Sequence, residues 1–190
     1  MFQQLKDVIL AATRQRQSFA IAIGYSGKDY LVNTVDVPKV LSGLYAIAEG
    51  TPRCIKDQSV MDIVPGYRLI HRLELQDEIK AFRKAYPNLV THSPFLADYS
   101  SCYYTVDSEG VVYSVDSVHG AEAISKSLQI FLATVLDCYI RGAYFLDADG
   151  YLDYDPEFEG QIGSELNPDY QYWSVTRDAA QTGEPGNASL

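Results

Sequence analysis

Residues 121–167 read AEAISKSLQIFLATVLDCYIRGAYFLDADGYLDYDPEFEGQIGSELN, and this stretch decides the fold class that the sequence predicts. In its first half, apolar residues recur at steps of three or four, the period of an amphipathic helix with a broad buried face. The residues that set this period are Ile124, Leu128, Phe131, Val135 and Tyr139. Arg141 and Gly142 are typical of a helix end, where a cation suits the helix dipole and glycine adopts the left-handed conformation. We therefore predict a long core helix near residues 121–141.

The second half combines acids with tyrosines and then predicts a shorter helix. Asp155 and Pro156 are typical of a helix start, because Asp caps free backbone N–H groups and Pro fits the first helical position. Asn167 stands before a proline and is expected to end this helix. The acids do not follow the spacing of a calcium loop, because placing Gly150 at its sixth position puts Pro156 where the loop needs Glu. We predict no metal or other cofactor here and interpret the acids as solvated turn residues.

The rest of the chain mixes helices and hairpins without a βαβ rhythm. Helical spacing is found at residues 2–16, 38–49 and 75–86, and strand-like stretches at 18–25, 30–35, 67–73, 101–106 and 111–115. Residues 18–35 are predicted to form one hairpin, and residues 53–62 fit neither pattern. The sequence therefore predicts an α+β fold in which a mainly antiparallel sheet packs with helices. We expect one domain over residues 1–175 and a disordered tail at 176–190, where almost nothing is available for burial.

The clearest hairpin joins residues 101–106 to residues 111–115. Its four-residue connection ends in Gly110, as is typical of a turn whose last residue has a positive φ. Because side chains alternate along a strand, Tyr104 and Val106 are expected on one face and Tyr103 and Thr105 on the other.

Charge restricts the class of partner. The chain has 15 basic and 25 acidic residues, which gives a net charge of −10. Such a chain repels nucleic acids and anionic membranes, and it attracts basic proteins or cations. Cys54, Cys102 and Cys138 are odd in number and lie far apart, so we expect reduced thiols in a cytoplasmic protein. Charged residues interrupt the N-terminal apolar run, so no signal peptide is predicted.

No motif carries catalytic chemistry. His71, His92 and His119 are isolated from one another and from cysteine at ligand spacing, which argues against a zinc site. No nucleophile elbow is present.

Tyrosine is the residue type that points to binding, because the chain has 15 of them and several lie among acids. Tyr offers a large, stiff contact surface with one polar tip, and surrounding acids orient a basic partner. For any single Tyr, a place in the core explains its presence as well. The predicted partner-binding residues are Glu49, Asp98, Tyr99, Tyr103, Asp107, Asp149, Tyr151, Asp153 and Tyr154.

Three stretches resemble the SUKH superfamily, which includes fungal cell-wall synthesis regulators and bacterial immunity proteins. Val37-Pro38 followed by LYAIAEG at 44–50 resembles its "LP…LY…NG" opening, with Glu in place of Asn. The hairpin at residues 98–113 is similar to its "d…yy.vd..G.Vy" strands, and residues 124–144 look like its "ia.sf..fl…y..gay" helix. The resemblance spans about residues 35–167, and residues 1–34 have no counterpart in it.

This resemblance implies an α+β domain that is not an enzyme and acts by binding another protein. Our main hypothesis is an immunity protein that neutralises a cognate toxin, and a nuclease with a basic cleft suits the charge of this chain. The alternatives are a regulatory adaptor of the same fold that binds host proteins, and a small-molecule-binding domain or enzyme. The sequence predicts neither the identity of the partner nor the oligomeric state.

Overall fold

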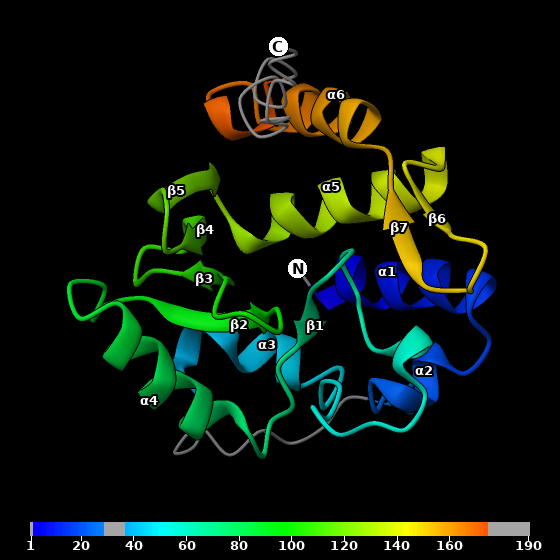
Figure 1. Cartoon of the computed structure of the whole chain (residues 1–190), viewed down its shortest axis with the longest axis horizontal. Helices are drawn as coiled ribbons and strands as arrows, with labels where there is room; N and C mark the ends of the chain where they lie inside the picture. The colour runs from blue at the N-terminus through cyan, green and yellow to red at the C-terminus, as the bar shows by residue number, and fades with distance from the viewer. Residues whose placement is uncertain (1, 29–36, 175–190) are drawn as a thin grey trace, which may run out of the picture.

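The computed structural model describes residues 2–28 and 37–174, which form an α+β fold (Figure 1). Its α-helices are α1 (Phe2–Gln15), α2 (Phe19–Ala22), α3 (Ser42–Tyr45), α4 (Leu75–Ala85), α5 (Leu128–Arg141) and α6 (Pro156–Leu166). Short 3-10 helices lie at η1 (Lys39–Leu41), η2 (Gln58–Val60) and η3 (Gln171–Trp173). The strands are β1 (Arg68–Leu69), β2 (Ser93–Ala97), β3 (Tyr103–Val106), β4 (Val112–Asp116), β5 (Gly120–Ser125), β6 (Tyr144–Leu146) and β7 (Leu152–Tyr154).

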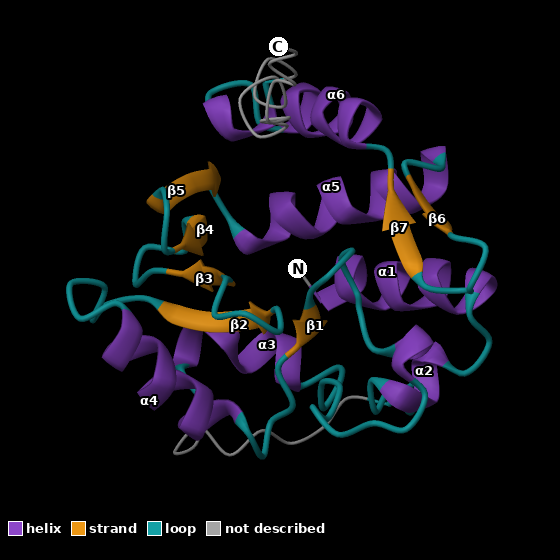
Figure 2. Ribbon diagram, viewed as in Figure 1, coloured by secondary structure: helices purple, strands orange, loops and turns teal. Residues whose placement is uncertain are grey.

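An antiparallel sheet in the order β1-β2-β3-β4-β5 separates α4 from α5 (Figure 2). The predicted alternation in β3 is confirmed, and helices cover both of its faces. The ring of Tyr103 meets Phe82 of α4 edge-on at 5.3 Å, while the ring of Tyr104 lies 5.3 Å from Phe131 of α5. All four residues of β3 are therefore buried, as expected for a central strand between two helical layers.

The long helix begins later than the sequence predicts. Residues 120–125 form β5, which pairs with β4, and α5 starts only after Ser127, whose Oγ accepts a hydrogen bond from the Ile130 N–H at 3.3 Å. The predicted start at residue 121 is therefore wrong, because the turn after β4 returns the chain along the sheet edge before a helix can form. The predicted end is confirmed, since Gly142 adopts a left-handed φ of 85°.

The predicted strand at residues 18–25 is also wrong. Residues 19–22 form α2, in which Phe19 is buried and Ile21 is 83% exposed; Ile23, directly after the helix, is also buried. The Arg16 guanidinium lies 4.5 Å from the centre of the Phe19 ring and draws this segment against α1. A short alternation of apolar and small residues is compatible with the two-residue period of a strand and with the period of a helix. Burial of residues 19 and 23, which are four positions apart, fits the helix. The partner strand predicted at 30–35 and the tail predicted at 176–190 lie outside the described residues.

Several other predictions are confirmed, and two elements are shorter than expected. The helices predicted at 2–16 and 75–86 correspond to α1 and α4, and Asp155 caps α6 by accepting the Phe158 N–H at 3.0 Å. The helix predicted at 38–49 is reduced to η1 and α3, and the strand predicted at 67–73 to β1. The acidic stretch expected to form a turn contains a second sheet, the hairpin β6–β7. Within residues 2–28 and 37–174, no helix is both long enough and apolar enough to span a bilayer.

The last described segment, α6 with η3, is fastened to the rest of the protein by buried hydrogen bonds. The Trp173 indole Nε1 donates to the carbonyl of Ile124 in β5 at 2.7 Å. The Asn167 side-chain amide donates to Thr134 Oγ1 of α5 at 2.9 Å. Within the segment, Ser164 Oγ of α6 donates to the Trp173 carbonyl of η3 at 2.8 Å. Trp173 therefore has a fixed position between the sheet and α6.

We expect Gly163→Ala to destabilise this segment. A Cβ at position 163 would stand 2.1 Å from the Trp173 ring, which is buried and cannot move away freely. The overpacking should lower the free energy of unfolding by about 1–3 kcal/mol and outweigh the helix-propensity gain of about 1 kcal/mol. Urea unfolding monitored by tryptophan fluorescence measures the change. Gln161→Ala, at an exposed position of the same helix, is the control, and equal stability of the two variants would contradict the prediction.

We also expect His92 to make the fold less stable in weak acid. His92 is buried against the Tyr113 ring, its Nδ1 lies 2.9 Å from Thr105 Oγ1, and burial lowers its pKa below the ordinary value. The unfolded chain therefore binds a proton that the folded chain resists, so stability falls as the pH drops below about 6.5. Urea unfolding at about pH 5 and pH 7.5 should show a smaller difference for His92→Gln than for the unmodified chain. An unchanged difference would show that another group is responsible.

Candidate functional site: an aromatic cleft beside α6

A cleft of about 260 Å³ opens between the sheet and the segment formed by β7, α6 and η3. The elements around it come from distant parts of the sequence, and five aromatic side chains and two carboxylates are among its lining residues. These are Tyr67, Tyr104, Tyr154, Tyr172, Trp173, Asp116 and Glu159.

The aromatic rings form the floor and one wall of the cleft. Tyr104 of β3 is 5% exposed, and its ring centre lies 4.6 Å from that of Tyr67. The Tyr104 and Tyr172 hydroxyl oxygens lie 3.0 Å apart, and the Tyr172 ring stands nearly perpendicular to the Trp173 ring at 4.9 Å. Tyr154, at the end of β7, is 39% exposed among these lining residues. The rings are therefore held by contacts with one another before any ligand arrives.

Burial, together with neighbouring groups, keeps the hydroxyls of the floor neutral. Burial raises the pKa of Tyr104 well above its ordinary value, and nearby Tyr172, Tyr67 and Glu159 raise it further. Burial likewise raises the pKa of Tyr67. The floor therefore presents neutral hydroxyls that can donate or accept hydrogen bonds.

The carboxylates are held by the fold. Burial alone would raise the pKa of Asp116, but the backbone N–H groups of Val118 and His119 each donate to it at 2.7 Å and bring its pKa below the ordinary value. Glu159 Oε1 accepts the buried Tyr144 hydroxyl at 2.6 Å. Among the described residues that line the cleft, none is Lys or Arg. The lining therefore combines aromatic rings, hydroxyl groups and two carboxylates with His119, whose Nδ1 lies 3.1 Å from Asp116 Oδ2.

Four of the predicted partner-binding residues lie on the hairpin β6–β7. Asp149, Tyr151 and Asp153 are exposed, and Tyr151 is 48% accessible. Tyr154 follows on the same strand and lines the cleft. This part of the prediction coincides with a surface that reaches the cleft.

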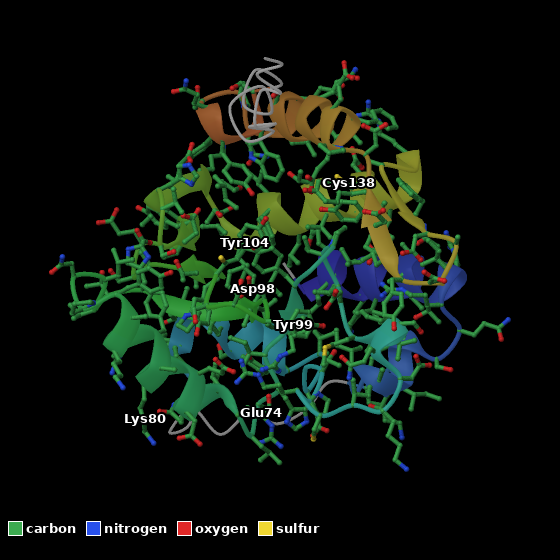
Figure 3. The ribbon with its side chains drawn as sticks, viewed as in Figure 1. Glu74, Lys80, Asp98, Tyr99, Tyr104 and Cys138 are labelled. Atoms are coloured by element: carbon green, nitrogen blue, oxygen red, sulfur yellow. The ribbon has the colours of Figure 1, made fainter. Side chains whose placement is uncertain are left out.

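The other predicted residues are dispersed and have local structural contacts. Tyr99 is exposed and donates to Asp62 Oδ1 at 3.2 Å, while Asp98 accepts the backbone N–H groups of residues 100 and 102 (Figure 3). Asp107 accepts backbone N–H groups in the β3–β4 turn, and Glu49 lies 3.4 Å from the Arg72 guanidinium. Tyr103 is buried and donates to Glu78 Oε2 at 3.4 Å. These residues do not form one patch with the hairpin.

Sequence reasoning missed most of the cleft. The nine predicted residues include Tyr154 but neither Tyr104 nor Tyr172. Tyr67, Asp116, Glu159 and positions 172–173 converge only because η3 returns to β5. No spacing of residues in the sequence predicts that η3 packs beside β5.

A second charged cluster lies beside α4 and has a structural explanation. Arg68 is 1% exposed and donates to the Thr51 carbonyl at 2.7 Å, with Glu74 at 2.8 Å and Glu78 at 3.1 Å. Figure 3 shows Glu74 near α4, well away from Tyr104 in that view. The acids neutralise a buried cation, so this cluster is not a candidate binding site.

Comparison with protein-family models finds no match, and comparison with curated proteins finds no significant match. The resemblance to the SUKH superfamily therefore stays a prediction. The functional inference has to be drawn from the site itself.

We expect Arg68→Met to destabilise the protein by about 3–5 kcal/mol, because two carboxylates would lose a buried counter-charge. Chemical unfolding monitored by circular dichroism measures this loss. Lys80→Met is the matched control, since Lys80 pairs with Asp77 at 2.9 Å on the exposed side of α4, where a pair contributes below about 1 kcal/mol. Similar losses in both variants would show that the Arg68 cluster does not stabilise the core.

Proposed function

We propose that this chain is a protein-binding module without catalytic activity, and that it neutralises a basic toxin by binding it. The observation that carries the proposal is the cleft beside α6, which combines five aromatic side chains with two carboxylates. The immunity role follows the SUKH resemblance, and a nuclease is the toxin class whose basic cleft best fits a net charge of −10.

Physical considerations support protein binding. Tyr and Trp are enriched where proteins meet, because they bury a large surface at a low cost in side-chain entropy. Here the rings are already held by contacts such as the one between Tyr67 and Tyr104, so little ordering is needed on binding. Acidic groups around such anchors accelerate the approach of a basic partner and set its orientation.

The carboxylates suit recognition better than turnover. Asp116 is committed to the turn after β4, and Glu159 accepts the Tyr144 hydroxyl. The exposed acids Asp149 and Asp153 extend the negative surface onto the β6–β7 hairpin, where they can meet a large partner.

Purification of the tagged chain from its native cells, followed by identification of the bound protein, tests this function. We expect a partner with a basic surface, whose toxicity in cells is suppressed when the two proteins are produced together. The dissociation constant of the purified complex should rise at least about tenfold between about 0.05 and 0.5 M NaCl, because salt screens exposed charges. The dissociation constant of the same complex at the lowest salt concentration is the reference.

A partner with an acidic binding surface, or an affinity that salt does not change, would contradict the electrostatic part of the proposal. If the captured protein is a host regulator that is not toxic, the neutralising role is wrong and the adaptor role takes its place. Chemical conversion of a captured small molecule by the purified chain would overturn the proposal as a whole.

A further inference from the structure

The β6–β7 hairpin exposes aromatic rings on the side that faces away from the core. In this hairpin, Phe145 lies opposite Asp153, and one step further the Asp147 N–H donates to the Tyr151 carbonyl at 2.9 Å. Because side chains alternate along each strand, these four residues share one face, which we call the outer face. Leu152, on the other face, is 8% exposed, whereas Phe145 is 41% and Tyr151 is 48% exposed.

The two rings of the outer face are neighbours, and the backbone that carries them is fixed. Tyr151 lies two residues before Asp153, the partner of Phe145, and such diagonal neighbours are within reach of each other when they are aromatic. Asp147 Oδ1 accepts the Tyr151 N–H at 2.8 Å, which orders the turn. The hairpin is also held to α1, because the Gln15 side chain donates to the carbonyl of residue 144 at 3.0 Å. Adjacent exposed rings on an ordered surface are typical of an interaction site.

The charge around these rings selects the class of partner. Asp149 and Asp153 are exposed, and in the described part of the chain neither takes part in an ion pair. Asp153 Oδ1 accepts the backbone N–H of the next residue at 2.8 Å, which orients the carboxylate and brings no positive charge. Residues 142–176 contain no Lys or Arg, and Arg141, just before them, pairs with Glu165. The outer face is therefore acidic as well as aromatic.

This combination favours one occupant over two others. A second copy of the chain would bring aspartates against aspartates, and an anionic membrane would also be repelled. A segment that carries both basic and apolar side chains would attract the carboxylates and cover the rings, whose faces also interact favourably with cations. We propose that the outer face of the β6–β7 hairpin is the surface that captures a basic, partly apolar segment of the partner protein.

This inference rests on the proposed function and can be tested without the partner. The probe is the peptide acetyl-Lys-Leu-Lys-Leu-Lys-amide, added to the isotope-labelled full chain and followed by NMR. We expect saturable chemical-shift changes at the backbone amides of residues 145–153, with a dissociation constant of about 1–10 mM. Acetyl-Gln-Leu-Gln-Leu-Gln-amide lacks the charge and acetyl-Lys-Ser-Lys-Ser-Lys-amide lacks the apolar side chains. Each of these two peptides should bind at least about fivefold more weakly.

Two variants with matched controls test the rings and the charge separately. Tyr151→Ser removes an exposed ring and should weaken binding of the probe about fivefold, whereas Val118→Ser, at a position that is 81% exposed in the β4–β5 turn, should not. Asp153→Asn removes one charge, keeps an acceptor for the backbone N–H, and should weaken binding about threefold. Glu109→Gln, at an exposed position in the β3–β4 turn, changes the net charge by the same amount and should leave the affinity unchanged. Thermal unfolding establishes that each variant is folded.

Shift changes that map outside residues 145–153, or no saturable change, would overturn the assignment of the outer face. Equal affinities within either pair of variant and control would also overturn it. The protein-binding proposal is judged separately, on the captured complex. If that complex is salt-sensitive and keeps its full affinity when Tyr151→Ser and Asp153→Asn are combined, the outer face is wrong and the general function stands. If the probe binds the outer face and no basic partner is captured, the general function is wrong and the peptide site stands.

Discussion

Burial of β3 from both sides is the constraint on which the rest of the structure depends. Tyr103 points toward α4 and Tyr104 toward α5, so one strand anchors a helical layer on each face of the sheet. A strand enclosed in this way cannot slip by one residue without exchanging its two faces. The positions of α4 and α5 relative to the sheet therefore follow from the register of β3, and the other elements pack around these three.

The same constraint shapes the candidate site. Tyr104 lies on the face of the sheet that packs against α5, and its hydroxyl oxygen lies 3.0 Å from that of Tyr172 in η3. Trp173 is bonded to the Ile124 carbonyl in β5, which holds η3 beside the sheet edge. The cleft thus consists of core residues of the sheet on one side and a fastened surface segment on the other. Such a site is rigid before binding, which reduces the entropy lost when a partner arrives.

Many of the acidic residues take part in ion pairs and hydrogen bonds of the fold, which the net charge of the chain does not reveal. Glu74 and Glu78 belong to the buried Arg68 cluster, and Arg141 pairs with Glu165 at 2.6 Å on the surface between α5 and α6. Of the carboxylates that line the cleft, Asp116 accepts two backbone N–H groups and lies 3.1 Å from the His119 Nδ1, and Glu159 accepts the Tyr144 hydroxyl. The net charge therefore does not show which of the acids are engaged in the fold.

Local patterns in the sequence by themselves determined the α+β class, the hairpin β3–β4 and the caps at Gly142 and Asp155. Each of these depends on residues within a few positions of one another, where side-chain period and capping chemistry leave little choice. Tertiary structure alone decided that residues 120–125 become a strand and that 19–22 become a helix, because pairing with β4 and packing on α1 outweigh weak local preferences. It also decided the cleft, since Tyr104 and Tyr172 stand 68 residues apart and meet only when η3 docks on β5.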